Sequence, residues 1–297
     1  MDMSQLRSFI AVAEAGSYIK AADVLGIPQP TLSRQVRTLE IELRACLFHR
    51  HGRGVRLTDK GSNFLEYARS VIHMVEAAIL SVRDNDSVFT GQLAIGLTPS
   101  IGRILIPALV PLLKAQFPLA SIRLIEGLSG ALYEKVLLGQ IDFALLLSPA
   151  SSPHLSIEPL ATEQLYLIGP ATSEPEEDIA LKSIVDLPLI LPHSNQWTRP
   201  AVETAAAKLG LRLRIDLEVD STASTIEMVS SGGGYSIMPG SLQQLADNPP
   251  LSWRKINQPY LEATISLITS TRQPCSKLVQ AAAQLVKQTW SEVTPTT

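Results

Sequence analysis

The sequence contains little cysteine and no long hydrophobic run. Its two cysteines, Cys46 and Cys275, stand far apart in a chain of 297 residues, which argues against a disulfide, a zinc site and a peroxide-sensing thiol pair. We expect both to be small buried apolar residues. The most apolar stretch, residues 101–113, is interrupted by an arginine and two prolines, and the amino terminus has no apolar segment of signal-peptide length. The sequence therefore predicts a cytoplasmic protein without a membrane span.

Motifs of the common enzyme classes are also missing. We find no nucleophile elbow, no P-loop, no dinucleotide-binding glycine pattern, and no His/Cys/Asp cluster with metal-ligand spacing. Residues 96–102, Gly-Leu-Thr-Pro-Ser-Ile-Gly, resemble a phosphate loop only superficially. We therefore predict no catalytic residue, no metal and no cofactor.

Charge is distributed unevenly along the chain. Residues 1–60 carry nine Lys and Arg against six acidic residues, a net charge of +3, whereas the remaining residues carry sixteen against twenty-two, or -6. This asymmetry is expected when only the amino-terminal end of a protein contacts phosphate. The basic end is thus a candidate nucleic-acid-binding domain.

Residues 17–43 have the pattern of two short helices joined by a tight turn. Ser17 can cap the first helix through its hydroxyl, and Gly26 suits the left-handed conformation that ends a helix. The second helix begins at Pro28 or Pro30, and its apolar residues recur every three to four positions: Leu32, Val36, Leu39 and Leu43. Polar and cationic residues are left on another face, as in a recognition helix that meets base edges.

Two further elements follow this helix pair. Short apolar strands near residues 47–48 and 55–57 flank a basic loop with two glycines, which predicts a wing that carries Arg50 and Arg53 toward DNA. A long helix then begins after Thr58, with a coiled-coil-like seam that indicates dimerisation; packing against the chain's own body is the alternative. The seam consists of Phe64, Ala68, Val71, Val75, Ile79 and Val82.

From residue 91 onward, short apolar runs alternate with helical patterns, which is typical of β/α units. We expect strands at residues 92–97, 121–126 and 142–147, two more short strands within 156–168, and a second lobe built on the same plan. The last helix, residues 276–290, should return to the first lobe. The segment around residues 84–91 is the expected hinge between the linker helix and this body.

One set of residues in the first sixty-one positions forms a specific pattern: Leu6, Arg7, Ser8, Phe9, Gly16, Ser17, Ala21, Ala22, Leu25, Gln29, Pro30, Leu32, Ser33, Arg34, Gln35, Leu39, Glu40, Leu47, Phe48, Arg50, Leu57, Thr58, Asp59, Lys60 and Gly61. By this pattern the chain resembles the LysR-type transcriptional regulators, over essentially its full length. Within that family, residues 50–55, 96–100, 126–129 and 139–142 are most similar to the nitrogen assimilation control branch.

The resemblance implies a mostly α winged helix-turn-helix domain at residues 1–58, and a linker helix at 59–88 that pairs subunits. It also implies an α/β effector domain at 89–297 with the two lobes of a periplasmic-binding protein. Lobe I would span about 91–161 and 267–297, and lobe II about 162–266. By motif match, the DNA-contacting residues would be Ser17, Gln29, Pro30, Thr31, Ser33, Arg34, Arg37, Arg50 and Arg53.

Three positions depart from the family pattern: Pro28 stands where a capping Ser or Thr is common, Arg44 replaces a common glycine, and Cys46 replaces a common proline.

A ligand of a doubly wound sheet binds beyond the carboxyl ends of the strands, in the crevice between lobes. Polar residues at such places could hold a small effector by hydroxyls and helix ends, and a small anion fits this mostly uncharged set. The candidates are Thr98, Pro99, Ser100, Ser129, Ser148, His193, Ser194 and Thr222.

The resemblance implies a regulator that binds inverted repeats in double-stranded promoter DNA as a homodimer or homotetramer, with RNA polymerase as a further partner. Activation and repression both stay open. An effector in the cleft would modulate binding, and the alternative is an effector-independent regulator of the nitrogen-assimilation kind. A solute-binding protein or an enzyme on the α/β body is a more remote alternative, because neither needs the basic first sixty residues.

Overall fold

The computed structural model describes residues 1–51, 54–82, 89–171, 177–194, 196–245, 251–272 and 275–294. The chain divides into two compact units near residue 86, which are described separately. Among the helices in these ranges, none has the length and apolar character needed to cross a bilayer. The expected hinge around residues 84–91 falls mostly outside the described residues.

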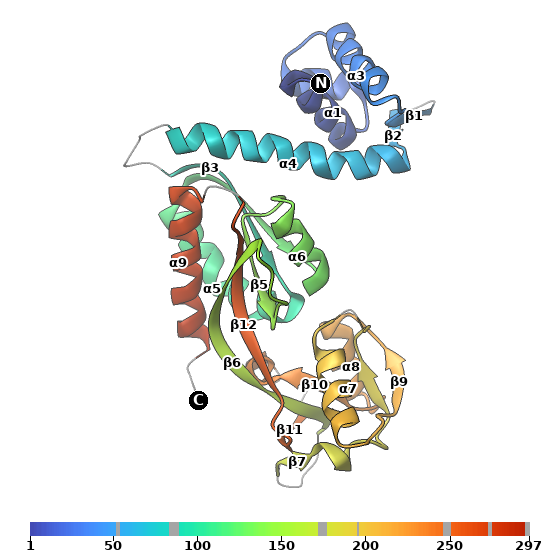
Figure 1. The fold of residues 1–297 in the computed structure, drawn as a ribbon, viewed down its shortest axis with the longest axis vertical. Coiled ribbons are helices and arrows are strands. Elements are labelled where there is room, and N and C mark those ends of the chain that lie inside the picture. Colours follow the sequence, from blue (N-terminus) through green and yellow to red (C-terminus); the bar gives the residue numbers. More distant parts are fainter. Residues whose placement is uncertain are drawn as a thin grey trace. The chain divides into compact units, whose positions relative to one another are not determined.

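The first unit is a helical domain with a small hairpin (Figure 1). Helices α1 (Met3–Ala15), α2 (Tyr18–Leu25) and α3 (Gln29–Leu43) pack together, and strands β1 (Phe48–His51) and β2 (Gly54–Leu57) form an antiparallel pair that precedes α4 (Asp59–Val82). Phe9 lies at the centre of the core, with its ring centroid 5.3 Å from that of Phe48 and 5.2 Å from that of Phe64. The predicted helix pair, wing and linker helix are therefore all present.

The predictions about the helix ends differ in outcome. Gly26 adopts the left-handed conformation with φ 63° and ends α2 as expected, and Thr58 Oγ1 accepts the Gly61 N–H at 2.9 Å at the start of α4. Ser17 occupies the N-cap position of α2, but its hydroxyl makes no capping hydrogen bond, so that prediction was wrong. Arg44 ends α3 with φ 49°, a backbone conformation that favours glycine.

The predicted seam of α4 is only partly free for a partner. Phe64 and Ala68 pack into the core of the first unit with Leu65 and Ile72, because that stretch of α4 lies against α1. Two seam residues, Val71 and Ile79, are exposed, and so are Tyr67 and Met74, which the predicted seam did not include.

Both cysteines are free and exposed, so the prediction that they are buried was wrong. Cys46 lies in the connection between α3 and β1, and Cys275 directly precedes the last helix. Neither position belongs to a hydrophobic core, and this explains their exposure. The residues that the structure describes contain no group of three or more His, Cys, Asp and Glu side chains arranged to hold a metal ion.

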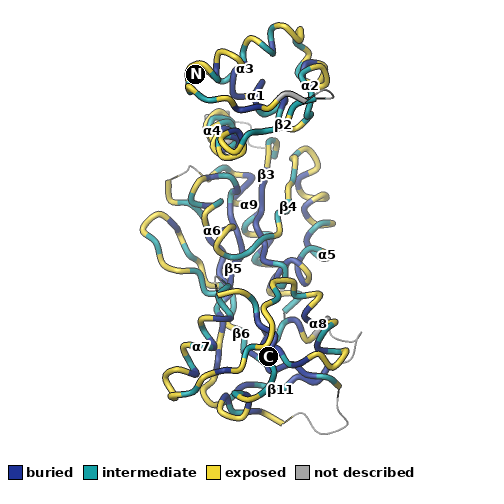
Figure 2. Tube along the Cα trace, turned by 90° about the vertical axis from the view of Figure 1, so that its right-hand side faces the viewer, coloured by how far each residue is buried: buried dark blue, intermediate teal, exposed yellow. Residues whose placement is uncertain are grey.

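The second unit is built on an eight-stranded sheet with a core on both faces. Its strand order is β4-β3-β5-β12-β6-β11-β7, with β10 paired to β6. Lobe I contains β3 (Thr90–Leu97), α5 (Pro99–Gln116), β4 (Leu119–Glu126), α6 (Ser129–Leu137), β5 (Phe143–Leu147) and α9 (Lys277–Val293). Helices α5 and α9 pack on one face of the sheet and α6 on the other (Figure 1), and the strands between them are largely buried (Figure 2). The last helix returns to lobe I as predicted.

Lobe II lies in the chain between β5 and α9 of lobe I. It contains β7 (Ile179–Ala180), η1 (Leu181–Ser183), β8 (Leu189–Leu191), α7 (Thr198–Lys208), β9 (Ile215–Glu218), α8 (Thr222–Ser230), β10 (Ser236–Pro239), η2 (Gly240–Leu245) and β11 (Leu251–Gln258). The strands β8 and β9 form a separate parallel pair.

The connection between the lobes differs from the prediction of two short strands. A single strand, β6 (Leu155–Pro170), pairs with β12 (Glu262–Ser270) in lobe I and continues into lobe II, where it pairs with β10 and β11. A shift in register between Ile265 and Ser266 lets the long pair bend without a break. The lobes are therefore joined by continuous sheet.

A buried carboxyl group lies in this shared strand. Glu163 Oε2 accepts a hydrogen bond from the Ser241 hydroxyl of η2 at 2.8 Å, while its Oε1 is buried and has no hydrogen-bond partner among the described residues. Burial raises the pKa of the Glu163 carboxyl above its ordinary value, and the bond from Ser241 only partly opposes this shift.

Glu163 is expected to make the free energy of unfolding fall as the pH rises. Because its folded-state pKa is raised, the folded chain holds the proton of Glu163 more tightly than the unfolded chain does. The resulting stabilisation is complete below the ordinary pKa of about 4.5, and it is lost as the pH rises from there through the raised pKa. Replacing Glu163 by Gln should flatten this slope in chemical denaturation at pH 5 and pH 8. Glu158→Gln, half exposed on the same strand, is the control; equal slopes for both variants would contradict the assignment.

Candidate functional site

The helix α3 separates its apolar and polar residues as predicted. Leu32, Val36 and Leu39 are fully buried in the first unit. Six of the predicted DNA-contacting residues lie on the other side of the helix. Four of them are exposed, Gln29, Pro30, Arg34 and Arg37, and two are half-buried, Thr31 and Ser33. Two guanidinium groups and several short polar side chains therefore face outward from the first three turns of this helix.

The start of α3 is held by backbone groups. Pro28 stands at the N-cap without a side-chain capping bond, and its carbonyl accepts the N–H groups of Thr31 at 2.9 Å and Leu32 at 3.1 Å. The position therefore does without the hydroxyl that Ser or Thr would supply. Amide groups at a helix start and a positive end of the helix dipole favour a nearby phosphate.

The wing is fixed to the helices at two points. Glu40 Oε1 accepts the N–H of Leu47 at 2.7 Å and that of Phe48 at 3.3 Å, which ties α3 to β1. The Val55 N–H donates to the Gly16 carbonyl at 3.0 Å, which ties β2 to the end of α1. This positioning role of Glu40 was not predicted from its place in the family pattern.

The predicted wing contacts are only partly described. Arg50 lies on β1 opposite Val55 in the backbone register, and Arg53 lies outside the described residues. Ser17 is half-buried at the start of α2, where its carbonyl accepts the Ala21 N–H at 3.0 Å. The structure thus brings the α3 residues together on one exposed surface and places the hairpin after it.

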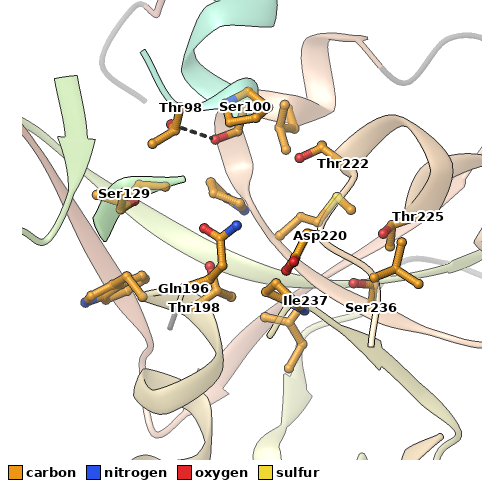
Figure 3. Close-up of a pocket in the computed structure, with 18 residues that line it drawn as sticks. Thr98, Ser100, Ser129, Gln196, Thr198, Asp220, Thr222, Thr225, Ser236 and Ile237 are labelled. Carbon is orange, nitrogen blue, oxygen red and sulfur yellow. Dashed lines mark hydrogen bonds between the residues drawn. The ribbon is translucent and has the colours of Figure 1, made fainter. Parts of the chain in front are cut away.

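A cavity lies between the two lobes of the second unit (Figure 3). Water molecules can occupy a volume of about 70 Å³ in it. This is room for about five to seven waters at about 10–15 Å³ each. Five of the eight predicted effector residues line it: Thr98, Pro99, Ser100, Ser129 and Thr222. The prediction from strand ends and helix starts therefore locates the cavity.

The other three predicted residues, Ser148, His193 and Ser194, do not line this cavity. Ser148 Oγ accepts the Thr264 N–H at 3.0 Å, and the Ser148 N–H donates to the Thr264 carbonyl at 2.7 Å, so this residue joins the end of β5 to β12. His193 and Ser194 are exposed beyond β8, where the chain runs past the cavity wall before α7 begins.

Several lining residues were missed in lobe II. They come from the start of α7, the end of β9, α8 and the strand β10, and comprise Gln196, Trp197, Thr198, Asp220, Thr225 and Ser236. Asp220 follows β9 just as Ser129 follows β4, so the strand-end rule that identified Ser129 would also have identified Asp220. It adds a carboxylate to the mostly uncharged set of residues that the sequence predicts for this crevice.

Two family models match this chain. The model for bacterial regulatory helix-turn-helix proteins of the lysR family matches residues 3–62, and the LysR substrate binding domain matches residues 87–291. The nitrogen assimilation regulatory protein Nac of Klebsiella aerogenes is 31% identical over 290 residues, which cover 96% of this chain and 94% of that protein.

Solved structures agree with this assignment at the level of the fold. A full-length OxyR variant from Pseudomonas aeruginosa has a TM-score of 0.72 at 24% identity and covers 98% of this chain and 95% of its own. Full-length CbnR complexed with its target DNA has a TM-score of 0.71 at 24% identity, covering 97% and 100%. The chain belongs to the LysR family of DNA-binding transcriptional regulators, with a helix-turn-helix domain and a substrate-binding domain.

Proposed function

We propose that this regulator reads an inverted repeat in promoter DNA with the exposed face of α3, assisted by the wing, and that it does so as a homodimer or a homotetramer of paired dimers. The single observation that supports this most strongly is the division of α3 into a buried apolar stripe and an outward face with Arg34 and Arg37. Cytoplasmic location and contact with RNA polymerase are part of the same proposal.

The proposal is tested with the purified full-length protein and a random duplex library, followed by footprinting on the selected sites. Two-fold related subunits should select a site with two-fold sequence symmetry, bound about a thousandfold or more tightly than unrelated DNA. Enrichment of no sequence, or equal protection of every duplex, would contradict the assignment of α3 as a recognition helix.

Within the same proposal, a small molecule in the interlobe cavity modulates DNA binding. Thr98 and Ser100 support this, because they place two hydroxyls 3.3 Å apart at the start of α5, facing the cavity. The alternative is an effector-independent regulator, which the 31% identity to a nitrogen assimilation regulatory protein favours. A screen of DNA binding in the presence of small metabolites separates the two.

Replacing Ser100 by Ala is expected to weaken the response to an effector while DNA affinity without the effector stays unchanged. A hydrogen bond to a charged ligand contributes about 1.5–3 kcal/mol, so about tenfold more effector or beyond should be needed for the same response. Titration of effector in a DNA-binding assay measures this. Ser291→Ala, at an exposed position on α9, is the control; an equal loss of DNA affinity with and without effector would instead indicate a structural role for Ser100.

A further inference from the structure

The two walls of the interlobe cavity differ in charge character. On the lobe I side, Thr98, Ser100 and Ser129 stand at the starts of α5 and α6 (Figure 3). Helices of this length carry a partial positive charge at their first turn, where free amide groups and hydroxyls can bind a carboxylate. The lining residues from lobe I include no acidic side chain. This wall therefore suits the anionic end of a ligand.

The lobe II wall contributes a carboxylate. Asp220 Oδ1 accepts the His193 N–H at 2.9 Å, which orients the carboxyl group, and its Oδ2 has no hydrogen-bond partner among the described residues. Asp220 is the one formally charged side chain among the described residues that line the cavity, which include neither Lys nor Arg. An ammonium group is the natural partner for such a carboxylate.

Two buried hydroxyls show that the cavity is built for polar contacts. Thr98 and Ser236 line it with relative exposures of 4% and 1%. The Ser236 hydroxyl lines the cavity from β10 and can donate or accept a hydrogen bond there. A polar ligand atom beside Ser236 would use that capacity.

We infer that the cavity binds a small zwitterion, an α-amino acid with a short side chain, with its carboxylate at the starts of α5 and α6 and its ammonium group at Asp220. This inference rests on the proposed function of the cavity as an effector site. The small volume of the cavity, about 70 Å³, favours compact ligands such as glycine, alanine or serine. A dicarboxylate of the same size would place its second negative charge against Asp220, where repulsion opposes binding.

Calorimetric titration of the full-length protein tests this inference. The probes are glycine, L-alanine and L-serine, with acetate, propionate and malonate as ligands that lack the ammonium group and ethylamine as one that lacks the carboxylate. The amino acids should bind at least tenfold more tightly than any of the other four. Equal or tighter binding of the carboxylic acids would overturn the inference, and so would a lack of binding by every probe.

Replacement of Asp220 by Asn preserves an acceptor for the His193 N–H but removes the charge. This variant should lose at least tenfold in affinity for the amino acid and should bind propionate as well as it binds alanine. Tighter amino-acid binding by the variant would overturn the role of Asp220. Ser236→Ala provides a second test that leaves the charge of the cavity unchanged. This variant should also bind the amino acid more weakly, and unchanged binding would contradict the contact at Ser236.

DNA footprinting with the same preparations distinguishes a failure of the zwitterion inference from a failure of the proposed DNA-binding function. A protein that footprints its DNA site and responds to malonate or propionate supports an effector cavity but overturns the zwitterion. A protein that footprints its site and binds none of the probes overturns the zwitterion and favours the effector-independent alternative. A protein without any specific footprint contradicts the proposed function, whatever it binds in the cavity.

Discussion

Replacing Arg34 by alanine is expected to abolish sequence-specific binding to promoter DNA. The side chain is exposed on α3 between the buried positions Leu32 and Val36, so it can reach a base edge or a phosphate without disturbing the core. A well-placed arginine contact contributes about 1–3 kcal/mol of discrimination. Because the loss occurs once in each half-site of an inverted repeat, about 2–6 kcal/mol disappears in total. That reduces affinity for the specific site toward the non-specific level.

Footprinting on the specific site and on an unrelated duplex measures this effect. Arg34→Lys keeps the charge but loses the planar fork of donors, so it should retain non-specific binding and lose most of the discrimination. Arg103→Ala removes the same charge from an exposed position in the second unit and should change neither quantity much. Undiminished footprinting by the Arg34→Ala protein would show that α3 does not read the DNA sequence.

The sequence predicts the DNA-binding end better than the effector end for a physical reason. The stripe of α3 is a local pattern, because residues three and four apart in one helix share a face wherever that helix lies. Leu32, Val36 and Leu39 could therefore be assigned to the core, and Arg34 and Arg37 to the outside, without knowledge of the fold. The spacing of these residues along the helix is enough to assign them to the buried or the exposed face.

The cavity, in contrast, is assembled from segments that are distant in the sequence. Thr98 and Ser236 meet only because β6 continues from one lobe into the other, and the apolar runs within residues 156–168 gave no sign that they form one strand. Ser148 was misplaced for a related reason, since its hydroxyl is used by the Thr264 N–H of a strand that arrives more than a hundred residues later. Polar residues at strand ends are frequent, and only their contacts separate lining residues from structural ones.

The linker helix shows how tertiary packing changes a periodic pattern. The predicted seam began with Phe64 and Ala68, but α1 covers both. A seam of apolar residues on a long helix can serve the chain's own core over one stretch and a partner over another, and the spacing alone does not distinguish them. Val71 belongs to the predicted seam, whereas the exposure of Tyr67 and Met74 beside it became visible only with the packing of α1 in place.

Replacing Met74 by aspartate is expected to dissociate the dimer. Tyr67, Val71 and Met74 recur at spacings of four and three on α4, and they are 57%, 39% and 44% exposed in the single chain. Large apolar side chains in such a row mark a surface that a second helix covers. In a two-fold symmetric pair each substitution occurs twice, and burial of an unpaired charge costs several kcal/mol. We therefore expect the dimer dissociation constant to rise by about a thousandfold or more.

Sedimentation equilibrium of the full-length protein measures the dissociation constant, and DNA titration with the inverted repeat measures its consequence. The Met74→Asp monomer should bind one half-site weakly and lose most of its affinity for the complete site, since two linked recognition helices bind far more tightly than one. Ser62→Asp adds the same charge to the first turn of α4, where the helix dipole favours it, and should leave the dimer intact. If α4 instead packs on the chain's own body, Met74→Asp will lower the unfolding temperature without changing the subunit number, and the paired-helix assignment will be wrong.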